Sequence, residues 1–184
     1  MTELNLTGIT SYPNRYVLMS ALVKDINPDG LFCEFGVQNG DSINAIAQAI
    51  KPNIIHGFDS FYGLPEAWNN MPAEVFSREG QLPTVEDNVI LYKGLFDVTL
   101  PEFAKAATKH IAFAHIDCDL YSSTKTIFGA LAKLFIPGSI IQFDELHGYD
   151  KWLDHEYKAL LEFGRPFEYI GYSLPGQQVA VRLI

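Results

Sequence analysis

The stretch Glu34-Phe35-Gly36-Val37-Gln38-Asn39-Gly40 decides the fold, because its two glycines separate an apolar run from an amphipathic one. The apolar run, Leu31 to Phe35, predicts a buried strand, and the helical spacing of apolar residues over 43–50 predicts a helix after the turn. At such a turn the missing β-carbons let the backbone approach a ligand, and the first amides of the helix point toward it. We therefore expect a ligand-binding α/β sheet.

The residues around this turn favour a cofactor with a positively charged end. Asp59 ends the next apolar run, nineteen residues after Gly40, where a carboxylate can bind the two hydroxyls of a ribose. The spacing G-x-x-x-G differs from the dinucleotide pattern, with Gln38 at the place of a second glycine, and the Glu34 carboxylate would repel a pyrophosphate. The same carboxylate suits the sulfonium and amino groups of S-adenosylmethionine. An ordinary strand-to-helix turn with an acid at the strand end is the alternative.

Length and composition favour a single domain over residues 1–184, with 48% hydrophobic and 19% charged residues. The formal charge of −9 leaves no excess of Lys or Arg for phosphates, so neither nucleic acid nor an anionic membrane is an expected partner. Cys33 and Cys118 lie in apolar runs and match no metal spacing, as reduced core thiols do. Without a charged leader or an apolar run of eighteen residues, we expect a cytoplasmic protein.

The order of the expected elements predicts five strand–helix units closed by a C-terminal hairpin. An opening helix covers 16–26, and the first helix after a strand runs to about residue 50. Later helices are expected at 101–108, from a cap at Ser122 or Ser123 to about residue 135, and at 153–161. The five strands are expected at 31–35, 54–58, 89–92, 111–116 and 139–143, and the hairpin at 167–172 and 178–183. This predicts a mostly parallel seven-stranded sheet with one antiparallel strand, the Rossmann-like architecture of class I methyltransferases.

The segment 60–87 is an unusually long connection between two expected strands. It contains several prolines and glycines and shows no sustained period, which is typical of an irregular insertion. Loops of this length often act as lids, and Tyr62, Trp68, Met71 and Phe76 could line an acceptor site beneath it. The same aromatic side chains could instead fix the loop to the core.

Acidic residues follow two further strands, in His115-Ile116-Asp117-Cys118-Asp119 and in Phe143-Asp144-Glu145-Leu146-His147. Parallel strands bring their carboxyl ends to one edge of the sheet, so these acids should meet near Glu34 and Asp59. Carboxylates placed so close together raise one another's pKa unless a cation offsets the repulsion. Mg²⁺ or Ca²⁺, which prefer oxygen ligands, would do so. Helix capping is the alternative role for each acid, and His115 is expected to be a hydrogen-bonded core residue.

Five ordered motifs resemble the macrocin-type sugar O-methyltransferase family. They are Glu34 to Val37, Phe58-Asp59-Ser60-Phe61-Tyr62-Gly63-Leu64-Pro65-Glu66, Lys93 to Pro101, Ile116-Asp117-Cys118-Asp119-Leu120-Tyr121-Ser122-Ser123-Thr124, and Phe143-Asp144-Glu145. The resemblance covers residues 28 to 150. It implies an enzyme that uses S-adenosylmethionine to methylate a hydroxyl of a small molecule, often the sugar of a natural product, with help from Mg²⁺.

The resemblance also implies roles for single residues. Those implied to bind the cofactor are Glu34, Gly36, Gly40, Asp59, Ser60 and Asp117. The metal ligands would be Asp117, Asp144 and Glu145, where Glu145 stands in place of the family's second aspartate. Asp119 and His147 are the candidate bases. Little sequence precedes the first strand to cover the acceptor, which leaves two alternatives, a larger substrate or a partner subunit that completes the pocket in a homo-oligomer. A non-catalytic S-adenosylmethionine-binding module and an NAD-dependent oxidoreductase stay open as alternatives.

Overall fold

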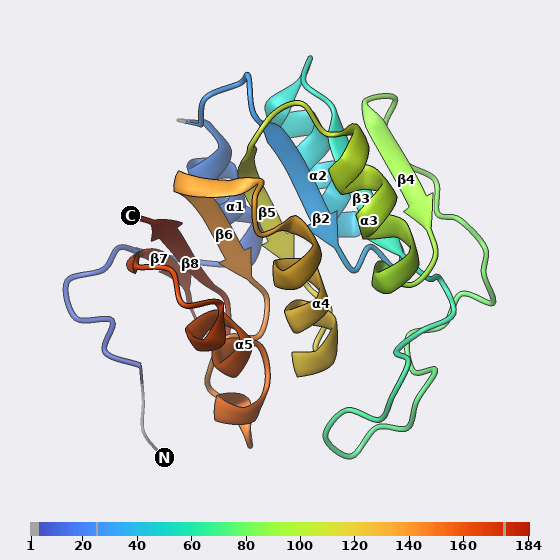
Figure 1. Cartoon of the computed structure of the whole chain (residues 1–184). Coiled ribbons are helices and arrows are strands. Elements are labelled where there is room, and N and C mark those ends of the chain that lie inside the picture. The colour runs from blue at the N-terminus through green and yellow to red at the C-terminus, as the bar shows by residue number, and fades with distance from the viewer. Residues whose placement is uncertain (1–3, 25, 175) are drawn as a thin grey trace.

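Eight strands form one sheet in the order β1-β7-β8-β6-β5-β2-β3-β4, with helices on both faces (Figure 1). The computed structural model describes residues 4–24, 26–174 and 176–184. The strands are β1 (Ser11–Tyr12), β2 (Leu31–Phe35), β3 (Ile55–Asp59), β4 (Val89–Lys93), β5 (Ile111–Ile116), β6 (Phe135–Phe143), β7 (Phe167–Ser173) and β8 (Val179–Leu183). All neighbouring pairs are parallel except those of β8, which is antiparallel to β6 and β7. The mostly parallel sheet with one reversed strand is thereby confirmed.

Two helices pack on one face of the sheet and three on the other, and a separate apolar core lies under each layer (Figure 1). The helices are α1 (Arg15–Lys24), α2 (Asp41–Ile50), α3 (Phe96–Ala106), α4 (Tyr121–Leu131), the 3₁₀ turn η1 (Trp152–Asp154) and α5 (Glu156–Phe163). α1 and α2 cover residues such as Phe32 and Phe113, whereas α3, α4 and α5 cover Phe35, Phe58 and Phe143. Because a strand alternates its side chains between the faces, neighbouring residues of one strand serve different cores.

Several element boundaries differ from the sequence prediction. The sheet has an eighth strand, because β1 pairs with β7 along the edge. α3 begins at Phe96 rather than at residue 101, since Leu100 and Phe103 are the residues it buries, and Pro101 lies inside it. β6 begins at Phe135, so Pro137 and Gly138 lie within the strand instead of ending a helix. α1 ends at Lys24, and Asp25, which the predicted helix included, lies outside the described residues.

The register of the central strands places the predicted acids at one edge. Ile116 at the end of β5 pairs with Phe35 of β2 and with Phe143 of β6. The next residues are therefore neighbours, and the Asp144 amide donates to the Ile116 carbonyl at 2.9 Å. Convergence of these acids, expected from parallel strand topology, is what the structure shows.

The insertion between β3 and β4 crosses this same edge of the sheet (Figure 1). Its base is held by Phe61, which is buried and whose carbonyl accepts from the amides of Arg78 and Gly80. Its tip is a tight turn in which Trp68 and Met71 exchange two backbone hydrogen bonds. Among the described residues, no helix is long and apolar enough to span a membrane.

Candidate active site

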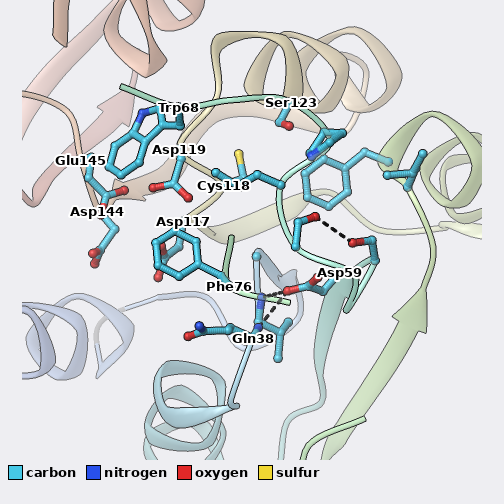
Figure 2. A pocket seen from close by; sticks show the side chains of 18 of the residues that line it. Gln38, Asp59, Trp68, Phe76, Asp117, Cys118, Asp119, Ser123, Asp144 and Glu145 are labelled. Atoms are coloured by element: carbon cyan, nitrogen blue, oxygen red, sulfur yellow. Dashed lines mark hydrogen bonds between the residues drawn. The ribbon is translucent and has the colours of Figure 1, made fainter. Parts of the chain in front are cut away.

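A cavity of about 450 Å³ opens at the carboxyl ends of β2, β3, β5 and β6, beneath the insertion (Figure 2). This volume lies in the range of ordinary small-molecule sites. Seven carboxylic acids line it: Asp41, Asp59, Asp97, Asp117, Asp119, Asp144 and Glu145. Within the described part of the chain, Arg15 is the only Lys or Arg among the lining residues. A cavity with this charge favours a ligand that carries a positive group.

Asp59, at the end of β3, organises the glycine turn. One carboxylate oxygen accepts from the amides of Val37 and Gln38, each at 2.8 Å, and the other accepts from the Phe61 amide at 2.7 Å (Figure 2). Asp59 and Ser60 both line the cavity, and the Ser60 hydroxyl oxygen accepts a hydrogen bond from the Tyr62 amide. The amides of Val37 and Gln38 are therefore occupied by a carboxylate, whose negative charge disfavours a phosphate at this place. This arrangement argues against a dinucleotide.

The two glycines of the turn are required for different reasons. Gly36 has φ of 90°, and a β-carbon there would lie 1.7 Å from the Asp117 carbonyl oxygen, so no other residue fits. Gly36 lines the cavity, and the protein group that it approaches closely is the neighbouring strand end. Gly40, with φ of 87°, starts α2 and packs against Pro83 of the insertion. Gly40 is not among the lining residues.

Glu34 lies behind the cavity rather than in its wall. Its carboxylate is fully buried, and Glu34 Oε1 lies 2.7 Å from His115 Nδ1 on β5. Burial lowers the pKa of His115, but the nearby carboxylates of Asp144 and Glu34 outweigh it and raise the pKa to about 10. Burial likewise raises the pKa of Glu34, and His115 opposes this. The expected core role of His115 is confirmed, and the pair is a buried ionic contact.

Asp117 and Asp144 form the centre of the acidic cluster. Together with His115 Nε2, their carboxylate oxygens form a group within 4.8 Å of one another, a spacing that can hold a metal ion. Glu145 lines the same cavity beside them but is not part of that group (Figure 2). Burial raises the pKa of Glu145, as do the charges of Asp117 and Asp144. The pKa of Asp144 instead falls to about 2, because contacts with His115 and Arg15 outweigh the effect of burial.

Asp119 stands over the cavity in a constrained backbone conformation. Its φ of 62° is left-handed, a conformation that costs energy for a residue with a side chain and that is common at functional sites. Burial, followed by the charge of Asp144, raises the pKa of Asp119 to about 7. His147, the other candidate base, lies outside the lining of the cavity and packs edge-on against Trp152 at 6.4 Å between ring centroids.

The insertion contributes aromatic side chains to the cavity. Trp68 and Phe76 line it, and Figure 2 shows Trp68 beside Asp119 and Glu145. Trp68 also packs edge-on against Tyr149 and His155 at centroid distances of 5.9 and 6.5 Å, which joins the insertion to the segment after β6. Tyr62 is instead exposed and faces Lys93, and neither it nor Met71 lines the cavity.

Two site features have no signal in the sequence. Arg15 begins α1, outside every motif of the predicted site, and becomes part of the site only because α1 reaches the edge near Asp144. Glu156 begins α5 and is fully buried beneath the cluster, where burial and the charge of Asp119 raise its pKa. Both depend on tertiary packing, which local patterns do not encode.

Cys33 and Cys118 are buried free thiols, as expected.

A family model and solved structures of known proteins identify the family of this chain. A family model described as a methyltransferase domain matches residues 33–146, which is more than half of the chain. The crystal structure of CalS11, a calicheamicin methyltransferase, is 25% identical, with a TM-score of 0.71 over 91% of this chain and 77% of that one. The apo structure of CalS11, titled a TDP-rhamnose 3'-O-methyltransferase, is 27% identical, with a TM-score of 0.64 and coverage of 91% and 78%.

The O-methyltransferase NovP gives a TM-score of 0.61 at 20% identity, covering 91% of this chain and 78% of that one, a likeness of fold. Comparison with curated protein sequences gives no significant match. The structural likenesses support an enzyme over a non-catalytic module, and the occupied amides of the glycine turn disfavour an NAD-dependent oxidoreductase. The chain therefore belongs to the methyltransferase-domain family and is an S-adenosylmethionine-dependent enzyme of class I fold.

Proposed function

We propose that this enzyme methylates a hydroxyl group of a small molecule, a sugar or a sugar-bearing natural product. The observation that carries the proposal is the position of Asp119 in the wall of an acidic cavity, with a pKa of about 7. A general base works best when its pKa is close to the pH at which it acts. The similarity to CalS11, a calicheamicin methyltransferase and TDP-rhamnose 3'-O-methyltransferase, supports a sugar hydroxyl as the acceptor.

The cofactor would occupy the end of the cavity near the glycine turn. Asp59 lines that end, and it keeps the capacity to accept hydrogen bonds from ribose hydroxyls while it orders the turn. Acids along the rest of the wall would attract the positive sulfonium group toward Asp117 and Asp119. Transfer requires the acceptor oxygen in line with the methyl group and water excluded, and Trp68 and Phe76 provide an apolar cover.

A divalent cation fits the acidic cluster. Two buried carboxylate oxygens, Asp144 Oδ1 and Glu145 Oε2, have no hydrogen-bond partner in the structure, and unsatisfied buried oxygens are suitable ligands for a hard cation. Asp117, Asp144 and Glu145 would hold Mg²⁺. When bound, the ion would lower the pKa of the acceptor hydroxyl. Asp119 then stands on the cavity side of the cluster to accept the proton.

The proposal is tested by measuring S-adenosylhomocysteine release with a panel of acceptors. The panel should include free sugars, glycosides and nucleotide-linked sugars, each with Mg²⁺ and with EDTA. We expect release with a subset of the hydroxyl acceptors, none with their O-methylated analogues, and loss of the reaction in Asp119→Asn. If EDTA leaves S-adenosylhomocysteine release unchanged, the metal has no part in the reaction. If release occurs only with amine or thiol acceptors, the acceptor group is not a hydroxyl.

A further inference from the structure

We propose that Arg15 is a resident counter-cation of the acidic cluster, which a divalent ion must displace in order to bridge the Asp144 and Asp117 oxygens that Arg15 contacts. The inference rests on the proposed function, because it concerns the same metal site. It adds a residue outside every motif of the sequence, and it predicts that Arg15 sets the metal affinity of the enzyme.

The position of Arg15 is fixed by the beginning of α1. The Asn14 side chain accepts from the Val17 amide at 3.0 Å and caps the helix. The preceding strand, β1, pairs with β7, and the Leu174 amide donates to the Tyr12 carbonyl at 2.7 Å. The backbone of Arg15 is therefore anchored at the mouth of the cavity, and only its side chain is left to move.

The guanidinium group lies where a bridging cation would lie. Arg15 Nη1 donates to Asp144 Oδ2 at 2.9 Å and lies 3.9 Å from Asp117 Oδ2. Gln178 Nε2 donates to the same Asp144 oxygen at 3.2 Å. A divalent ion binds carboxylate oxygens at about 2.0 to 2.6 Å. An ion bound to these two oxygens would therefore be close to the guanidinium, and the two positive charges would repel each other.

Arg15 also contacts a side chain outside the cluster, that of Tyr16. Its Nη2 lies 3.4 Å from the Tyr16 hydroxyl, and its guanidinium carbon lies 5.2 Å from the centre of the Tyr16 ring. The Arg15 side chain is 33% exposed, so it can leave Asp144 for the exposed ring of Tyr16 without disturbing the core. Displacement by a metal ion is thus a movement of one side chain between two partners that are already in contact with it.

The test is a Mn²⁺ titration of metal-free protein followed by electron paramagnetic resonance, with Mn²⁺ as the probe. We expect Arg15→Gln to bind Mn²⁺ at least about tenfold more tightly than the wild type, because one positive charge is removed from beside the site. Arg15→Met, which keeps the aliphatic stem, should give the same gain. Arg182→Gln is the matched control, since Arg182 pairs with Glu168 on the surface, away from the site, and its removal should leave the affinity unchanged.

The outcomes separate this inference from the metal site itself. If the wild type binds Mn²⁺, Asp144→Asn does not, and both Arg15 variants bind it no more tightly, the metal site stands and the role of Arg15 is overturned. A gain in Arg182→Gln equal to that in the Arg15 variants would also overturn it, because the effect would then be one of net charge. If neither the wild type nor any variant binds Mn²⁺, the role of Arg15 and the metal site are both overturned. Methyl transfer measured in EDTA would then show whether the proposed methylation of a hydroxyl still holds without a metal.

Discussion

The buried pair of Glu34 and His115 can be tested by its contribution to stability. Both side chains are fully buried, and Glu34 Oε1 lies 2.7 Å from His115 Nδ1. Glu34→Gln keeps the shape and removes the charge that faces the imidazolium. Removing one partner of a buried ion pair destabilises a protein by about 3 to 5 kcal/mol, so we expect a loss of that size near pH 6. A double variant, Glu34→Gln with His115→Gln, should recover part of it, because neither charge is then left buried alone.

The pH dependence gives an independent magnitude. The pKa of His115 rises from an ordinary 6.5 to about 10 in the folded protein. At about 1.4 kcal/mol for each pH unit, a difference of that size corresponds to about 5 kcal/mol. The folded state holds the proton between these two pH values and the unfolded state does not, so this stabilisation is complete below about pH 6.5 and is lost as the pH rises toward 10. The stability of the wild type should therefore fall relative to the double variant over that range.

The measurement is urea unfolding in EDTA, followed by circular dichroism and tryptophan fluorescence at pH 6 and pH 9.5. A stability difference between the wild type and the double variant that does not change with pH would refute a charged pair. Calorimetry with S-adenosylhomocysteine completes the test. If Glu34→Gln lost cofactor affinity while its stability stayed at the wild-type level, Glu34 would contact the cofactor, as the sequence resemblance implies, and its role in the pair would be secondary.

Three further outcomes follow from the site. Asp59→Ala should weaken S-adenosylhomocysteine binding by about 1 to 3 kcal/mol in calorimetry, and unchanged affinity would exclude Asp59 as the ribose ligand. Asp119→Asn should retain cofactor binding but lower the rate of methyl transfer by a factor of about 10² to 10⁴. The wild-type rate should rise with pH through about 7, as Asp119 loses its proton. A fully active variant would show that another residue is the base. Residues 62–83 should gain hydrogen-exchange protection on adding S-adenosylhomocysteine and acceptor, more than the strand Ile111–Ile116, whereas high protection without ligands would make the insertion a fixed part of the scaffold.

The sequence predicted the sheet well because its signals are local. Apolar runs ending in acids marked the central strands, and the alternation of strands with helices implied their parallel order. Convergence of Asp117 and Asp144 followed from that order alone, and the register of β5 with β6 places them together. The two-residue strand β1 was missed because its pairing with β7 depends on a contact across most of the chain.

The finer chemistry of the site could not be predicted from spacing. The acid at Glu34 was interpreted as a cofactor contact because it precedes the glycine turn, but its side chain is fully buried and bonds His115 of the neighbouring strand β5. Glycine at position 36 was expected because the backbone could then approach a ligand, and the structure adds a second requirement, the close approach of the Asp117 carbonyl oxygen. Each difference arises from the direction of a side chain or from a neighbouring strand, and neither is visible in one stretch of sequence.

The charges of the site explain why it holds two positive groups of its own, the buried His115 and the partly exposed Arg15. Glu34, Asp117 and Asp144 are close together, and His115 and Arg15 lie between them. Without these two positive groups the carboxylates would have to take up protons, because buried like charges disfavour ionisation. With them, Asp144 stays ionised, with a pKa near 2, while Asp119, farther from both cations, titrates near 7. Asp144, which follows β6, and Asp119, which follows β5, are thereby suited to different tasks. Asp144 holds a positive charge, and Asp119 exchanges a proton.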